Sequence, residues 1–180
     1  LMISPDIAGA VEEIVAEISA RIERHNVKAV LLLLPRIGPE SYARIAEQLL
    51  AKHPQVRWQI HSDIALAKQL GTGLHLSSAA LRDVSAEQVY GLSSLSASIH
   101  SIDELRRAET VGIEFSVLGP VHTTATHPHA DTLEWAGFSE IAEAATTPLY
   151  ALGGMWKKDL PDALSNGAQG IAGISAFAAD

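Results

Sequence analysis

The sequence predicts a (β/α)8 barrel, in which eight parallel strands alternate with helices. Short aliphatic runs alternate with longer amphipathic stretches eight times along the 180 residues, which is the pattern of repeated βα units. The runs are almost continuously apolar, as in VLLLL at 30–34, and this is typical of parallel strands buried on both faces. An open doubly wound sheet is the alternative. Typical barrels have about 250 residues, so any insertions here must be short.

The expected strands follow one another at regular intervals. They are residues 1–4, 29–34, 57–60, 73–76, 95–99, 114–118, 149–152 and 170–174. The helices expected between them include 9–25, 41–52, 101–109 and 159–166. Apolar residues recur at helical spacing in the first two of these helices. Ser101 and Glu104 form a capping-box pattern at the start of the third, and Gly167 ends the fourth.

Composition limits the class of protein. Hydrophobic residues make up 47% and charged residues 19% of the chain, so we expect one globular domain over residues 1–180. A net charge of -8 disfavours nucleic acid and anionic membranes as partners. The absence of cysteine excludes disulfides and thiolate metal sites. No apolar run reaches the length of a membrane span, and we expect a cytoplasmic location. A chain that begins at Leu1 suggests a part of a longer polypeptide.

Two glycine-containing segments at the ends of the last two strands predict a phosphate site. They are YALGGM at 150–155 and GIAGISAF at 170–177. In barrels, backbone N–H groups in the turns after strands seven and eight commonly bind phosphate. The alternative is that Gly153 and Gly154 only allow a tight turn.

The long loop after the sixth expected strand carries hydroxyl and imidazole groups, in the sequence GPVHTTATHPHADTLEW at 119–135. These groups could bind phosphate, move a proton or hold a metal, or they could be solvated loop residues. Among the other strand-end residues, Arg36 could pair with an anionic substrate or lie free on the surface. His75 is expected in the core, and His100 is expected to support a strand end.

These segments together resemble the thiamine phosphate synthase/TenI superfamily. The similarity covers LMISP at the start of the chain, Ser98, His100, Ser101 and Glu104 as an S-x-H-S-x-x-E segment, the GPVH-x-T-x-T loop from Gly119 to His127, the ALGG turn and the closing G-I-A-G-I-S-A strand. The resemblance implies a (β/α)8 barrel and chemistry of thiamine biosynthesis. Members include a Mg-dependent transferase, which displaces diphosphate from a pyrimidine with a thiazole phosphate, and tautomerases that isomerise a thiazole phosphate. Others occur as C-terminal domains of Nudix hydrolase fusions.

The resemblance also implies which residues bind the phosphorylated ligand. They are Arg36, Ser98, Thr124, Thr126, Gly153, Gly154, Ile174, Ser175 and Ala176. The two aspartates that hold Mg in the synthase align with Ser62 and Ala80, neither of which can replace a carboxylate. Asp63 lies next to the first position. We therefore expect no protein metal ligands and no certain cofactor, with Mg binding left open.

Two histidines are the catalytic candidates. The tautomerase histidine aligns with Pro120, and His122 lies two residues further on, so it faces the same side if the chain is extended. His127 takes the place of the loop lysine. The resulting hypothesis is a protein that binds a phosphorylated thiazole or pyrimidine, with transferase or tautomerase chemistry. The alternative is a non-catalytic phosphate-ligand binding domain, accessory to a Nudix hydrolase. A fused Nudix domain and a homodimer are left open as partners.

Overall fold

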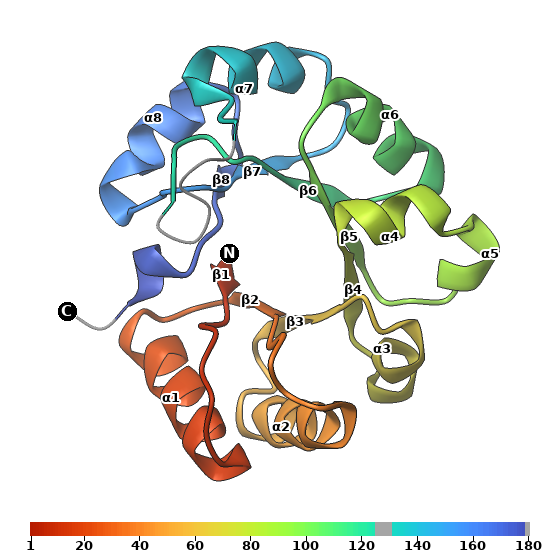
Figure 1. Ribbon diagram of the computed structural model, residues 1–180, viewed down its shortest axis with the longest axis vertical. Helices are drawn as coiled ribbons and strands as arrows, with labels where there is room; N and C mark the ends of the chain where they lie inside the picture. The colour runs from red at the N-terminus through yellow and green to blue at the C-terminus, as the bar shows by residue number, and fades with distance from the viewer. Residues whose placement is uncertain (125–130, 179–180) are drawn as a thin grey trace.

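The computed structural model describes residues 1–124 and 131–178 and shows a ring of parallel strands surrounded by helices (Figure 1). The eight strands pair in sequence order from β1 to β8, and each pair is parallel. An open doubly wound sheet would have a strand order that reverses at a switch point. The barrel prediction is therefore confirmed, and the open-sheet alternative is wrong.

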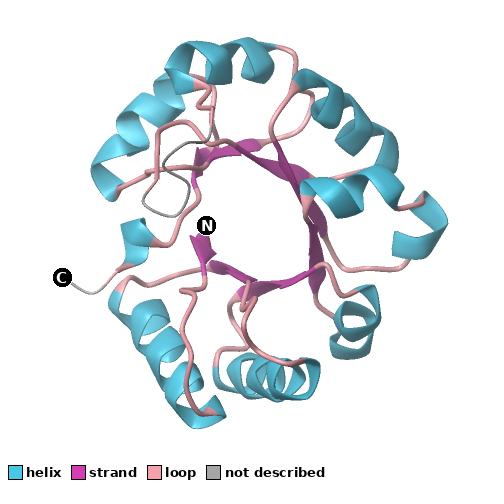
Figure 2. Cartoon of the chain, in the orientation of Figure 1, coloured by secondary structure: helices cyan, strands magenta, loops and turns pink. Residues whose placement is uncertain are grey.

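All eight strands lie where the aliphatic runs predict them, and several are shorter. They are β1 (Met2–Ile3), β2 (Ala29–Leu32), β3 (Arg57–His61), β4 (Gly73–Leu76), β5 (Leu95–Ile99), β6 (Phe115–Leu118), β7 (Leu149–Ala151) and β8 (Gly170–Ile171). The helices form the outer layer (Figure 2). They are α1 (Val11–Arg24), α2 (Pro39–Lys52), α3 (Ile64–Leu70), α4 (Ser78–Asp83), α5 (Ala86–Val89), α6 (Ile102–Val111), α7 (Glu134–Glu143) and α8 (Leu160–Ser165), with 3-10 turns η1 (Lys157–Asp159) and η2 (Ser175–Phe177). None of the helices described is long and apolar enough to cross a membrane.

Backbone contacts between the first and last strands close the ring. Met2 pairs with Gly173 in a parallel bridge. The Ile3 N–H donates to the Gly173 carbonyl at 3.0 Å, and the Gly173 N–H donates to the Leu1 carbonyl at 3.2 Å. The closing contact lies beyond the end of β8, so the expected strand over 170–174 is correct in place although only its first two residues have regular strand pairing.

Two apolar layers hold the barrel together. Alternate residues of a strand point to opposite faces, so Val30 and Leu32 pack with the helices while Leu31 packs inside the barrel. The interior cluster contains Ile3, Leu31, Val117 and Ala172. These come from β1, β2 and β6 and from the residue after β8. The remaining side of the interior, at β3 to β5, is polar and contains the buried Gln59, His75 and Ser96.

Candidate functional site

The turns after β7 and β8 present backbone donors at the carboxyl end of the barrel. Gly153 and Gly154 have φ values of +101° and +68°, which side chains other than glycine rarely adopt. A Cβ atom on Gly153 would also lie 2.7 Å from the Cα atom of Pro120. The glycines therefore allow both the turn and its close packing against the loop after β6. The glycines therefore do allow a tight turn, but this role does not account for the backbone N–H groups of the turn that lack an acceptor.

Four N–H groups of these turns, two of them on the buried residues Gly153 and Ala176, have no acceptor among the described residues. Within residues 1–124 and 131–178, no protein acceptor is found for the N–H groups of Gly153, Gly154, Ser175 and Ala176. Gly154 is half-buried and Ser175 is exposed. Backbone donors that lack a protein acceptor in the turns after β7 and β8 favour an anion with several oxygens, such as a phosphate. Ile174 is 39% exposed at the same strand end.

The start of the loop after β6 is fastened to the glycine turn. The Val121 N–H donates to the Leu152 carbonyl at 2.7 Å, and the His122 N–H donates to the Gly153 carbonyl at 3.2 Å. A Cβ atom on Gly154 would lie 3.1 Å from the Cβ atom of His122. The backbone therefore places His122 directly beside the two glycines, and its catalytic role stays a prediction.

The side chain of His122 is held by a carboxylate that the sequence did not predict. Its Nδ1 atom lies 3.1 Å from Oε2 of Glu134, and Trp135 presents a ring edge-on at a centroid distance of 5.5 Å. Glu134 also accepts from the Thr132 hydroxyl at 2.9 Å. When Nδ1–H donates to Glu134, the Nε2 atom of neutral His122 keeps its lone pair and can accept a proton. The His122 side chain is 36% exposed, so a ligand can reach it.

Three predicted loop residues differ in what can be said of them. Thr126 and His127 lie outside the described residues, so their predicted roles stay predictions. Thr124 is described and already has an interaction partner.

Arg36 lies after β2, where its guanidinium contacts Asp6 twice, through Nε to Oδ1 at 3.0 Å and through an NH2 group to the backbone carbonyl at 2.9 Å. Arg36 is therefore paired within the chain.

His75 and His100 have the supporting places that the sequence predicts. His75 is 1% exposed, and its ring nitrogens contact Ser96 and Ser98, each at 2.8 Å. Burial, followed by the nearby His61, lowers the pKa of His75 to about 3. Nδ1 of His100 contacts the Gly119 carbonyl, and its backbone N–H donates to Glu104 at 2.7 Å. His100 thus joins the ends of β5 and β6, and His75 belongs to the barrel core.

The residues at the family's metal positions do not fit a magnesium site. Ser62 has a φ of +53°, and its hydroxyl accepts from the Ser77 N–H at 3.3 Å. Ala80 has no side-chain oxygen. Asp63 caps α3, and its Oδ1 accepts from the Leu66 N–H at 2.9 Å. Among the described residues, no three His, Asp or Glu side chains converge on one point. Mg2+ in proteins is usually held by one or two carboxylates, and Ser62 and Ala80 supply none. The proposed reaction therefore has no step that depends on Mg2+.

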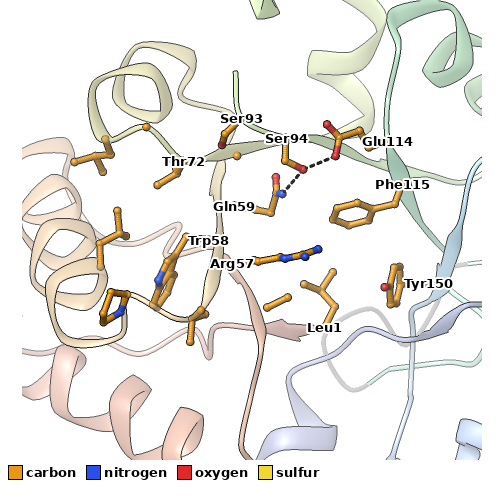
Figure 3. Close-up of a pocket in the computed structure, with 17 residues that line it drawn as sticks. Leu1, Arg57, Trp58, Gln59, Thr72, Ser93, Ser94, Glu114, Phe115 and Tyr150 are labelled. Carbon is orange, nitrogen blue, oxygen red and sulfur yellow. Dashed lines mark hydrogen bonds between the residues drawn. The ribbon is translucent and has the colours of Figure 1, made fainter. Parts of the chain in front are cut away.

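A cavity lies at the opposite end of the barrel, where the strands begin (Figure 3). Its volume is about 590 Å3. The polar and aromatic residues around it include Arg57, Gln59, Ser94, Glu114, Phe115 and Tyr150. None of the predicted site residues that the structure describes lines this cavity. In a (β/α)8 barrel the chemistry lies at the carboxyl ends of the strands, so the donors beside His122 define the candidate site.

Comparisons with known proteins agree with this fold. The family model for "Thiamine monophosphate synthase" matches residues 2–177. A relative from Aquifex aeolicus is 35% identical over 115 residues, which are 64% of this chain and 61% of that protein. A "Thiamine-phosphate synthase" of Listeria monocytogenes is 31% identical over 137 residues, which are 73% of this chain and 63% of that protein. The chain thus spans less than two thirds of the length of these relatives.

A solved structure shows the same fold. It is a thiamine phosphate pyrophosphorylase from Pyrococcus furiosus, which aligns with 99% of this chain and 86% of its own with a TM-score of 0.78 and 22% identity. At that identity the likeness concerns the fold alone. Together with the family match over nearly the whole chain, it leads to one conclusion: the chain belongs to the thiamine monophosphate synthase family.

Proposed function

We propose that this chain binds a phosphorylated heterocycle of thiamine biosynthesis, a thiazole phosphate in the first instance, and isomerises it by proton transfer. The observation that carries the proposal is the juxtaposition of His122, held by Glu134 at 3.1 Å, with the backbone donors of Gly153 and Gly154. Backbone N–H groups of both turns, including Ser175 and Ala176, bind the phosphate. The ring of the ligand then lies next to His122.

The proposed proton transfer follows from which ring nitrogen of His122 carries a hydrogen. Its Nδ1–H donates to Glu134, so Nε2 removes a proton from one position of the bound ring, and the resulting imidazolium returns it at another. The Glu134 carboxylate orients the imidazole ring of His122 and stabilises its protonated form during the reaction. This reaction needs no metal ion, which agrees with the lack of carboxylates at Ser62 and Ala80.

A second candidate is thiamine-phosphate synthase, the transferase. The names of the relatives favour it. The reaction releases diphosphate, whose concentrated charge must be stabilised, and the residues at the family's metal positions do not supply the usual means. The family match does not favour the non-catalytic alternative, phosphate binding accessory to a Nudix hydrolase.

Two assays on the purified chain separate these functions. One follows conversion between thiazole phosphate tautomers. The other measures thiamine phosphate formed from hydroxymethylpyrimidine diphosphate, thiazole phosphate and Mg2+. We expect turnover in the first assay and none in the second. Product in the second would establish the transferase and contradict our proposal. Binding of thiazole phosphate without turnover in either assay would contradict both catalytic functions.

Variants of the histidine and its carboxylate test the mechanism. His122→Ala should lower isomerisation by about a hundredfold or more, the usual contribution of a general acid or base, while thiazole phosphate still binds. Glu134→Gln should cause a smaller loss. Glu140→Gln is the matched control, because Glu140 is an exposed glutamate further along α7. If His122→Ala leaves the rate unchanged, His122 is not the catalytic base.

A further inference from the structure

His25, which directly follows α1, joins the two segments that carry the proposed phosphate donors. Its ring contacts one residue of each segment: Nδ1 lies 2.7 Å from Nζ of Lys157, and Nε2 lies 3.2 Å from the carbonyl oxygen of Ala178. Lys157 begins η1, three residues after Gly154, and Ala178 directly follows η2. Figure 1 shows this part of the chain, near the C-terminus, beside α1.

The lysine determines which ring nitrogen of His25 carries a hydrogen. A lysine ammonium group can only donate, so Nδ1 of His25 accepts from Lys157 and has no hydrogen of its own. The single hydrogen of the neutral ring is then on Nε2, which donates it to the carbonyl of Ala178. Both hydrogen bonds are lost in the other tautomer, so the two contacts support each other.

η2 has few other attachments to the barrel. Its two internal hydrogen bonds, each 3.1 Å long, stay within residues 174–178. Among the residues that the structure describes, the bond from His25 is the only hydrogen bond that joins this segment to another part of the chain. The ring of Phe177 also stands edge-on to His25, with centroids 5.9 Å apart. The place of η2 therefore depends on His25 and on the apolar packing of Ala176 and Phe177.

The helix before His25 is itself firmly held. α1 buries Ile14, Ile18 and Ile22 in the main apolar cluster. The backbone N–H of His25 donates to the Arg21 carbonyl at 3.1 Å, which continues the helical pattern to the residue after α1. The ring of His25 thus projects from a fixed element and restricts the segments that bond to it.

We infer that His25 is a positioning residue of the phosphate site, because its ring holds the segments after β7 and β8 in the places where their N–H groups bind phosphate. It acts through Lys157 and Ala178. Without it, η2 is displaced in part of the molecules, and the apparent affinity falls with the fraction that keeps the binding arrangement. The phosphate part of this inference rests on the proposed function, whereas the attachment of η2 does not.

The first test measures the attachment of η2 without any ligand. In the full chain, a peptide that covers residues 173–178 should exchange amide hydrogen faster in His25→Ala than in the natural chain, while a peptide that covers β3 should not change. His25→Gln should restore most of the protection, because an amide can accept from Lys157 and donate to Ala178. Unchanged exchange over residues 173–178 in His25→Ala would overturn the inference.

The second test measures the affinity for inorganic phosphate and for thiazole phosphate. His25→Ala should weaken both by roughly three- to tenfold, the equilibrium effect of one net hydrogen bond, and His25→Gln should recover most of the loss. In the isomerisation assay the loss should appear in KM, with kcat nearly unchanged, because His122 and Glu134 are not altered. Equal affinities of His25→Ala and the natural chain would contradict the positioning role.

A pair of neighbouring lysines separates the contact of Lys157 from its charge. Lys157→Met removes the donor to Nδ1 of His25 and should weaken phosphate binding. Lys158→Met is the matched control, since Lys158 is the adjacent exposed lysine of η1 and has no hydrogen bond or ion pair among the described residues. Each variant loses one positive charge, so the general attraction for phosphate falls in both. Equal losses would show that charge alone acts, and η1 would then not be held through His25.

Failure of the proposed function would give a different pattern. A natural chain that binds phosphate without isomerisation defeats the reaction, and the comparison of affinities still decides on His25. A natural chain that binds neither compound defeats the phosphate site as well. The exchange measurement then decides alone whether His25 holds η2.

Discussion

Burial of His75 makes the stability of the folded chain depend on pH. The ring is 1% exposed, and burial, then the nearby His61, lowers its pKa to about 3. In the unfolded chain a histidine titrates near pH 6.5. Between these values the unfolded state binds a proton that the folded state does not. Stability contributed by neutral His75 is therefore complete above about pH 6.5 and is lost as the pH falls towards 3, at about 1.4 kcal/mol per pH unit.

The comparison of the natural chain with His75→Gln isolates this effect. Urea unfolding measured at several pH values between 6 and 4 should give a steeper loss of stability for the natural chain, by about 1.4 kcal/mol per pH unit. His25→Gln serves as control, because His25 is only partly buried. Equal slopes for the natural chain and His75→Gln would show that His75 takes up a proton in the folded state.

For single residues, the sequence predicts the environment when the neighbouring residues in the chain determine it. Flanking leucines place His75 in the core, and a following cap residue places His100 at a strand end. Glu134 could not be predicted in the same way. It lies 12 positions from His122 in the chain, and it has a φ of +48°. The contact depends on the path of the loop between them, which no local pattern determines.

Among the secondary-structure elements, α2 packs on the core through Ile45 and Leu49 and also hydrogen-bonds to the sheet through one hydroxyl. The Tyr42 hydroxyl donates to the Leu32 carbonyl at 2.7 Å and accepts from the His61 N–H at 3.3 Å. It thereby joins the ends of β2 and β3, and burial raises the pKa of Tyr42 to about 12. Tyr42→Phe removes the partner of both backbone groups and should lower the free energy of unfolding by about 1–3 kcal/mol.

Urea denaturation measures this loss directly. Tyr90→Phe is the matched control, since Tyr90 is 85% exposed and its change should have little effect on stability. If Tyr42→Phe is as stable as the control, water replaces the hydroxyl at the two backbone groups.

The ends of elements show where sequence patterns lose information. The run VLLLL predicts a strand to residue 34, yet β2 ends at Leu32. The N–H and carbonyl of Leu33 bond to the hydroxyl of Ser4 instead of to a neighbouring strand, and the Leu32 carbonyl is taken by Tyr42. Aliphatic composition predicts that a segment is buried and extended, whereas partners from β1 and α2 decide where its pairing stops.

For the whole molecule, the repeat of eight βα units predicts the barrel. The sequence gives little information on how the first and last strands meet to close it. The strands at the seam are the shortest: β1 and β2 have two paired positions, as do β7 and β8, compared with four between β2 and β3. A single bridge, Met2 to Gly173, then closes the ring. Since local opening begins where backbone pairing is sparse, we infer that the barrel opens at this seam.

Hydrogen exchange followed by mass spectrometry tests the seam in the full chain. Peptides that cover β1 and β8 should exchange faster than peptides that cover β3 and β5, because their amides are released by local opening and need no global unfolding. The N–H groups of Ser175 and Ala176, which we propose bind phosphate, directly follow this seam, so thiazole phosphate should slow exchange in β8 more than in β3. Equal protection of all eight strands would mean that the ring opens only when the whole barrel unfolds, and the phosphate turn would then be as rigid as the core.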